Sequence, residues 1–182
     1  AVDGLILPFV AGFLPVFTAA ILTRKQRSVY ISYGIIITAG ITAYWYITMT
    51  LGSVGVLVLA VLVIMSDIGG YVFGRLVGGP KFWPSISPKK TWSGTVAGWL
   101  LAATVGMYFS NYFNYMWAVP VAVIVVFGAQ LGEIAESWVK RRVGVKDSSS
   151  LIPGHGGLLD RLDGFLGGAI IAGLFLNMYW VL

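Results

Sequence analysis

The sequence predicts an all-α integral membrane protein: a bundle of about six transmembrane helices with a polar site at its cytoplasmic side. Of its 182 residues, 58% are hydrophobic and 10% are charged, whereas a typical soluble domain is about 45–50% apolar and about 25% charged. Several apolar runs approach the roughly 20 residues that cross a bilayer. The 24 glycines suit close contact between helices in lipid. We therefore expect a single transmembrane domain, residues 1–182, without a soluble part large enough to fold alone.

The apolar segments alternate with connections that differ in charge. The segments cover residues 4–22, 29–49, 54–77, 95–108, 117–136 and 164–182. The fourth is short and can extend back to Thr91. All 12 Lys and Arg residues lie at the end of the first, third or fifth segment or after it, whereas the connections 50–53 and 109–116 carry none. Cytoplasmic loops hold the excess of Lys and Arg. This predicts a multi-pass protein of the cell (inner) membrane with both termini outside and its site facing the cytoplasm.

The stretch 137–163 concentrates charge in a chain that is otherwise apolar. It contains five of the 12 Lys and Arg residues, three of the seven acidic residues and the single histidine. A membrane protein keeps ionisable groups at depth only where they have partners or a function, so we predict a site for anionic, phosphate-bearing molecules. The net charge of +5 could also indicate nucleic acid, but no nucleic-acid motif accompanies it. We therefore expect no nucleic-acid partner.

Carboxylates occur near the predicted cytoplasmic ends of three segments. Asp67 is in the third segment, Glu133 and Glu136 end the fifth, and Asp160 and Asp163 precede the sixth. Isolated carboxylates in an apolar bundle are costly unless they are paired or bound to a cation. We predict that Glu133 and Asp160 are metal ligands, whereas capping and salt bridging explain Glu136 and Asp163 equally well. Asp67 could contact a metal, a ribose hydroxyl or a base.

The residue types available limit the choice of metal. With no cysteine and one histidine, the candidate ligands are carboxylate, hydroxyl and carbonyl oxygens. Such hard ligands next to a phosphate favour Mg²⁺ over zinc. The histidine, His155, stands among three glycines that let a backbone approach a ligand closely. We predict that it contributes to the site; a simple turn residue is the alternative.

The loop 78–94 is the second candidate for phosphate binding. Its three prolines predict an extended rather than a helical conformation. Lys89, Lys90 and Thr91 then stand just before a predicted helix, where cations and a hydroxyl group can cradle a phosphate. A basic loop that contacts anionic lipid headgroups is the alternative.

The polar positions of these regions resemble the signature of the phosphatidate cytidylyltransferases, the CDP-diacylglycerol synthases of membrane lipid synthesis. The positions that carry the resemblance are Ser137, Lys140, Arg141, Lys146, Asp147, Pro153, His155, Gly156, Gly157, Asp160, Arg161 and Asp163. The blocks 67–75 and 87–94 resemble the same family, so the likeness covers about residues 64–170, with loops 78–94 and 137–163 forming the site. Two features depart from the family pattern. Glu133 stands where members usually carry Asp, and the chain is shorter, without N-terminal spans that they have.

The resemblance implies transfer of the cytidylyl group of CTP to phosphatidate, which gives CDP-diacylglycerol and pyrophosphate. It implies Mg²⁺ as cofactor and a second, monovalent cation such as K⁺. The implied catalytic residues are Asp160, Glu133, Lys140 and Arg141, with Glu133 and Asp160 holding the metal. The implied substrate-binding residues are Asp67, Lys89, Lys90, Thr91, Ser137, Lys146, Asp147, His155, Arg161 and Asp163.

Other functions remain as alternatives. A CDP-archaeol synthase-like enzyme would use CTP on an ether lipid phosphate. A transporter would need charges along a path to the outer face, where the chain offers only Asp3. A lipid-binding scaffold without chemistry would follow if Glu133 disables the site. A homodimer is a further arrangement that the sequence leaves open.

Overall fold

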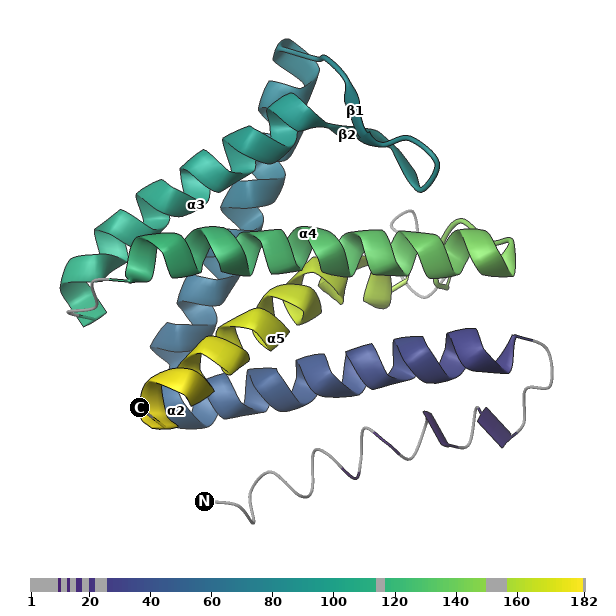
Figure 1. Cartoon of the computed structure of the whole chain (residues 1–182), viewed down its shortest axis with the longest axis horizontal. Helices are drawn as coiled ribbons and strands as arrows, with labels where there is room; N and C mark the ends of the chain where they lie inside the picture. The colour runs from purple at the N-terminus through teal and green to yellow at the C-terminus, as the bar shows by residue number, and fades with distance from the viewer. Residues whose placement is uncertain are drawn as a thin grey trace.

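The described part of the chain is a bundle of helices with one small β-hairpin (Figure 1). The computed structural model describes residues 10, 13, 16–17, 20–21, 26–113, 117–149 and 157–181. His155 and most of the expected segment 4–22 lie outside these residues. The described elements are α2 (Arg27–Leu76), β1 (Lys81–Trp83), β2 (Ser87–Thr91), α3 (Trp92–Phe113), α4 (Ala118–Val143) and α5 (Leu159–Val181).

Helix α2 consists of two arms that meet at Gly52. This residue has φ 65° and ψ −157° inside an otherwise helical run, a conformation that glycine adopts readily because it has no Cβ. The chain changes direction sharply at this point (Figure 1). The arms correspond to the expected segments 29–49 and 54–77, and the break falls in the expected connection. Of the described helices, α2 and α4 are long and apolar enough to cross a membrane.

Three helices extend beyond the segments expected from the sequence. Helix α3 begins at Trp92, α4 continues to Val143, and α5 begins at Leu159. Of the charged residues expected in a loop after residue 136, Lys140, Arg141 and Arg142 are therefore helical, whereas Lys146 and Asp147 follow the end of α4. The last turn of α4 carries three basic residues, which interact favourably with the negative end of the helix dipole. Gly144, with φ 78°, ends this helix in a left-handed conformation.

The connection between α2 and α3 is a β-hairpin, which the all-α prediction did not include. Strands β1 and β2 pair antiparallel, with Lys81 opposite Thr91. The extended conformation predicted from the prolines is thus confirmed. The ring of Phe82 lies 4.7 Å from that of Trp92 in an edge-to-face contact, which packs the hairpin against the start of α3. Strand β2 runs directly into α3 and lies at the charged edge of the bundle (Figure 1).

Helices α4 and α5 pack with their backbones in direct contact. Gly128 and Gly132 of α4 face Gly167 of α5, where an added Cβ atom would lie 2.9 Å from Gly132 Cα. Small residues permit this approach between helices in lipid. The core beside this contact contains buried small and branched residues such as Val126 and Ala169. Because the two backbones touch, the polar residues at their adjoining ends come close together.

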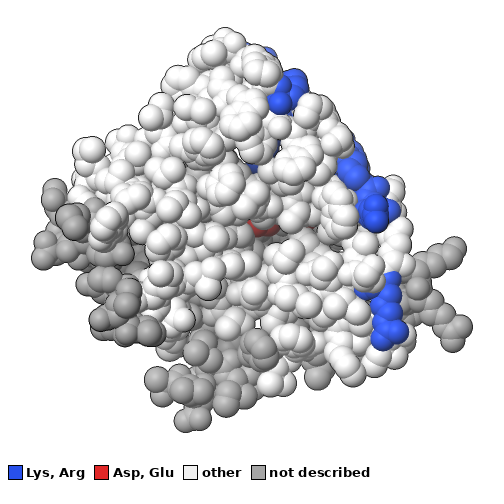
Figure 2. Space-filling model, in the orientation of Figure 1, with Lys and Arg blue, Asp and Glu red and all other residues white. Residues whose placement is uncertain are grey.

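Basic residues lie along one edge of the molecule. Figure 2 shows the Lys and Arg side chains along the right of the view, on a face that is otherwise almost free of them. The same edge carries the start of α2, the end of α4 and the hairpin, whereas the break in α2 and the start of α4 lie on the opposite side (Figure 1). This segregation agrees with the alternation of charge along the sequence.

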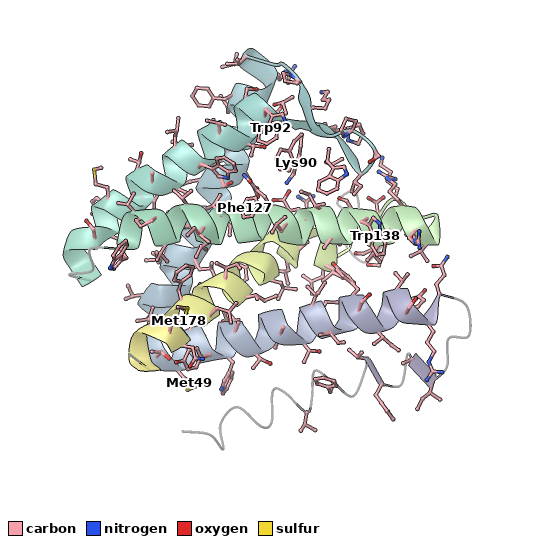
Figure 3. All side chains as sticks on the ribbon, viewed as in Figure 1. Met49, Lys90, Trp92, Phe127, Trp138 and Met178 are labelled. Carbon is pink, nitrogen blue, oxygen red and sulfur yellow. The ribbon has the colours of Figure 1, made fainter. Side chains whose placement is uncertain are left out.

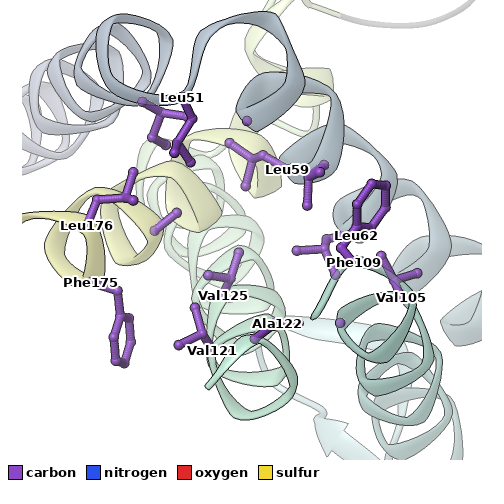
Figure 4. A pocket seen from close by; sticks show the side chains of 16 residues that line it. Leu51, Leu59, Leu62, Val105, Phe109, Val121, Ala122, Val125, Phe175 and Leu176 are labelled. Carbon is purple, nitrogen blue, oxygen red and sulfur yellow. The ribbon is translucent and has the colours of Figure 1, made fainter. Parts of the chain in front are cut away.

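An apolar cavity of about 240 Å³ lies near the uncharged ends of the helices (Figure 4). Side chains from four helices line it, among them Leu51, Leu59, Val105, Val125 and Leu176. The described residues that line it include no charged side chain. The charged groups of the bundle are therefore gathered elsewhere.

Candidate active site

Acidic and basic residues from three helices and the hairpin converge at the charged end of the bundle. We call the following seven residues the polar cluster: Asp67 (α2), Lys90 (β2), Glu133, Glu136 and Lys140 (α4), and Asp160 and Asp163 (α5). Figure 2 shows an acidic residue at the bottom of a recess in the middle of an almost uncharged face. The structure thus brings together all five carboxylates that the sequence placed at a similar depth.

Lys140 joins α4 to α5 through two short ion pairs. Its Nζ atom lies 2.6 Å from Glu136 Oε2 and 2.6 Å from Asp160 Oδ1. Lys140 and Glu136 are one turn apart on α4, and the Glu136 side chain is 1% exposed. Since a buried carboxylate without a counter-charge is costly, the Lys140 ammonium group allows Glu136 to be buried at this position.

Asp160 also fixes the connection that enters α5. Its Oδ2 atom accepts a hydrogen bond from Gly157 N at 2.7 Å, and from both the backbone N and the hydroxyl group of Ser148 at 2.9 Å. The bond from Gly157 is typical of an acidic side chain that reaches back to cap the start of a helix. With Lys140 on its Oδ1 atom, Asp160 has donors on both oxygens.

Lys90 brings the hairpin into the polar cluster from the opposite side. Its Nζ atom forms an ion pair with Glu133 Oε2, and the two side chains are 27% and 22% exposed. The carboxyl group of Asp67 interacts electrostatically with both Glu133 and Lys90. Figure 3 shows Lys90 reaching from β2 into the space between the hairpin and α4. One ammonium group therefore faces two carboxyl groups, one from α2 and one from α4.

Asp163 adds a fifth carboxylate to the polar cluster and interacts with Lys140, which already pairs with Glu136 and Asp160. Its carboxylate interacts with those of Glu133 and Glu136. Within the described structure, Glu136 Oε1 is buried and has no hydrogen-bond partner. Five carboxylates of the polar cluster thus face two ammonium groups. A proton or a cation is needed to balance this charge in an apolar bundle.

The described carboxylates do not form a ready-made metal cage. No group of three or more described His, Cys, Asp and Glu residues is arranged to hold a metal ion. The two predicted metal ligands have different partners: Glu133 pairs with Lys90, and Asp160 pairs with Lys140. Asp163 connects them, because it is one turn from Asp160 on α5 and interacts with Glu133.

Tyr33, on the first arm of α2, was not among the residues predicted for the site. It is half-buried and interacts electrostatically with Glu136, Asp160 and Asp163. The apolar sequence around it gives no indication of this position. The packing of α2 against α4 and α5 places this phenol group near the carboxylates.

The remaining predicted residues divide into surface and structural positions. Those exposed at the surface are Lys89, Arg141, Lys146, Asp147 and Arg161. Ser137 is half-buried on α4. Thr91 is buried, and its Oγ1 atom accepts a hydrogen bond from Gly94 N at 3.3 Å. This is the arrangement of a helix N-cap, so the Thr91 hydroxyl is engaged at the start of α3. His155 lies outside the described residues.

The helices are apolar, and their acidic and basic residues lie together at one end of the bundle. In membrane proteins, ionisable side chains placed in this way usually belong to a functional site. Residues 4–179 match the Cytidylyltransferase family. The chain therefore belongs to this family, and the resemblance predicted from the polar positions of residues 137–163 is confirmed.

Two curated relatives illustrate the similarity. The phosphatidate cytidylyltransferase of Brucella melitensis biotype 1 is 44% identical over 127 residues, which cover 68% of this chain and 47% of that protein. The phosphatidate cytidylyltransferase of Staphylococcus haemolyticus is 41% identical over 128 residues, which cover 68% of this chain and 49% of that protein. The chain thus spans about half the length of the curated relatives it matches. A solved intramembrane enzyme for archaeal membrane lipids biosynthesis aligns with a TM-score of 0.42 at 22% identity, covering 66% of this chain and 90% of that chain.

Proposed function

We propose that this chain transfers the cytidylyl group of CTP to phosphatidate, giving CDP-diacylglycerol and pyrophosphate. The observation that carries the proposal is the convergence of the polar cluster at one end of an apolar bundle, in a chain of the Cytidylyltransferase family. The relatives named above are phosphatidate cytidylyltransferases, and the match to the family spans every residue of the polar cluster. Such a site brings a charged nucleotide and a charged lipid headgroup to the same surface.

The reaction requires positioning and charge stabilisation more than proton transfer. An oxygen of the lipid phosphate forms a bond to the α-phosphorus of CTP, the bond from that phosphorus to the bridging oxygen of the β-phosphate breaks, and pyrophosphate leaves. The attacking phosphate is already ionised at neutral pH, so no general base is needed. Phosphoryl-type transfer of this kind depends mainly on alignment and on cations that stabilise the developing charge.

The residues of the polar cluster suit Mg²⁺ in their chemistry. All ligands offered are oxygens, the carboxylates outnumber the lysines, and the buried Glu136 Oε1 atom has no partner in the described structure. Mg²⁺ usually binds one or two carboxylates, with waters and substrate phosphates completing its shell. Glu133 and Asp67 would hold it, and when bound it would neutralise charge on the phosphates. Asp160 would have to exchange its present donors to become a ligand, so its predicted metal role stays a prediction, as does the monovalent cation.

The basic residues would bind the phosphates of both substrates. Lys90 and Lys140 stand inside the polar cluster, whereas Lys89 and Arg141 are exposed beside it. CTP would enter from the cytoplasm at the charged edge. The lipid would arrive laterally, with its acyl chains remaining between or beside the apolar helices of a cell membrane protein. The structure describes one copy of the chain, so a homodimer stays a prediction.

The test is incorporation of radiolabelled CTP into chloroform-soluble product by purified protein in detergent, with and without Mg²⁺. We expect Mg²⁺-dependent CDP-lipid formation from phosphatidate, and its loss in Asp160→Asn while the protein still accumulates in the membrane. Asp3→Asn, a carboxylate change outside the signature region, is the matched control. Full activity of Asp160→Asn would contradict the role of this residue. Product only from an ether lipid phosphate would favour the archaeol-type alternative, and no product from either lipid would favour a transporter or scaffold.

A further inference from the structure

We propose that Lys90 is an exchangeable counter-cation: its ammonium group occupies the position beside Asp67 and Glu133 that a divalent cation takes during the reaction, and binding of that cation releases Lys90 toward the incoming phosphates. The inference rests on the proposed function only in requiring that a divalent cation binds here. It goes beyond that function because it assigns an order of events: the divalent cation first displaces the Lys90 ammonium group, and Lys90 then binds the phosphates.

The ion pair between Lys90 and Glu133 has the features of a contact that can be exchanged. It joins two separate elements, β2 and α4, and both side chains remain partly exposed, at 27% and 22%. Partly exposed ion pairs stabilise proteins weakly, by about 1 kcal/mol or less. Asp67 supplies a second carboxyl group at the same place. One or two carboxylates are the number that a protein commonly offers to Mg²⁺.

The rest of the polar cluster favours the arrival of a further cation. The Glu136 side chain is 1% exposed. Within the described structure, its Oε1 atom has no hydrogen-bond partner. Asp163 interacts with both Glu136 and Glu133. The cluster therefore remains short of positive charge even with both lysines in place. A divalent cation at Glu133 would supply more charge than the single ammonium group that it replaces.

Release of Lys90 does not require the hairpin to unfold. The next residue, Thr91, is buried and caps α3, and Phe82 packs on Trp92 at the base of the hairpin. These contacts hold the β2 backbone while the four-carbon side chain of Lys90 swings away. Lysine binds phosphate as a flexible point charge, so the released ammonium group can follow the phosphates of a nucleotide that arrives with the metal.

The first test measures binding of Mn²⁺, as a probe of the Mg²⁺ site, by the electron paramagnetic resonance signal of free Mn²⁺ at constant ionic strength. We expect Lys90→Met to lower the Kd for Mn²⁺ by about fivefold, the factor that corresponds to roughly 1 kcal/mol for a partly exposed pair. Lys81→Met is the matched control, because Lys81 is an exposed lysine of β1 outside the polar cluster, and its Kd should equal that of the wild type. An unchanged or raised Kd in Lys90→Met would overturn the proposal.

A second measurement uses the wild-type protein and so does not depend on the folding of a variant. Lys90 is labelled with an amine-reactive reagent with and without Mg²⁺, and the modified sites are quantified by mass spectrometry. We expect Mg²⁺ to increase labelling of Lys90 but not of Lys81, an exposed lysine of β1, and we expect Glu133→Gln to abolish the response. Equal labelling of Lys90 with and without Mg²⁺ would overturn the exchange.

Neither measurement uses CTP or lipid, so the two proposals fail separately. A protein that forms CDP-lipid but shows no Mg²⁺-dependent release of Lys90 retains the proposed function and loses the exchange. A protein that releases Lys90 on Mg²⁺ binding but forms no CDP-lipid retains the exchange and loses the proposed function.

Discussion

Replacing Gly167 by alanine tests whether the backbone contact between α4 and α5 sets the geometry of the polar cluster. A Cβ atom at Gly167 would lie closest to Gly128 O, and it would also lie 2.9 Å from Gly132 Cα and 3.0 Å from Gly132 N, whereas ordinary contacts of a Cβ atom begin at 3.4 Å. The two helices must therefore separate by at least 0.5 Å, the difference between 2.9 and 3.4 Å. All three partner atoms belong to the backbone, so no side chain can move aside instead.

The separation has two measurable consequences. Overpacking typically costs about 1–3 kcal/mol, and the better helix propensity of alanine offsets about 0.5–1 kcal/mol, so we expect a net loss of about 1–2 kcal/mol. Each 1 kcal/mol lowers the melting temperature of a chain of this size by about 2–4 °C. The acidic residues of α5 also move away from those of α4. Since a displacement of ~1 Å can cost on the order of 100-fold in rate, we expect CDP-lipid formation to fall by on the order of tenfold.

Thermal unfolding in detergent and incorporation of radiolabelled CTP into lipid measure these two effects. Gly168→Ala is the matched control, because it adds the same methyl group at the next position of α5. Its Cβ atom would meet Leu59 Cδ1 at 3.3 Å and Ala129 Cβ at 3.5 Å, which are side-chain atoms. We expect the control to melt and react like the wild type. Equal damage by both substitutions, or none by Gly167→Ala, would refute the reasoning.

Two further substitutions separate structural from functional roles. Lys140→Met leaves the buried Glu136 without a counter-charge, so we expect a loss of about 3–5 kcal/mol in thermal unfolding. Adding Glu136→Gln should recover part of it, and no recovery would argue against the ion pair as the cause. Thr91→Val removes the hydroxyl that caps α3, so we expect a loss of about 1 kcal/mol with an unchanged KM for CTP. A large rise in that KM at unchanged stability would instead show a phosphate contact.

The apolar segments could be predicted from the sequence because they depend on composition averaged over about 20 residues. The break at Gly52 lies in a connection that was expected from the pattern of hydropathy. The hairpin could not be predicted in the same way. Its strands have three and five residues, too few for a periodic pattern to separate strand from loop. The prolines showed only that the segment is extended.

The site was predictable in its composition but not in its pairings. The positions of the charged residues in the sequence predicted five carboxylates near one end of the bundle. This was possible because ionisable groups are rare in an apolar chain. Which lysine meets which carboxylate depends on how each helix is rotated and on where β2 docks. Asp160 illustrates this, since its contacts with Lys140 and Ser148 come from positions 20 and 12 residues away, which sequence spacing does not relate. Tyr33 reaches the cluster through packing of α2 on α4 and α5.

The length of Glu133 explains how the hairpin is tied to this cluster. The family resemblance predicts aspartate at this position, and an aspartate would end its carboxylate short of the present one by about one carbon–carbon bond, roughly 1.5 Å. In this chain the longer side chain pairs with Lys90 on β2 and interacts electrostatically with Asp67 on α2. The carboxylates of α4 and α5 are thereby connected to an element outside the helical bundle. A change of charge at Glu133 acts directly on β2, which is the physical reason that a cation bound on α4 can govern where Lys90 points.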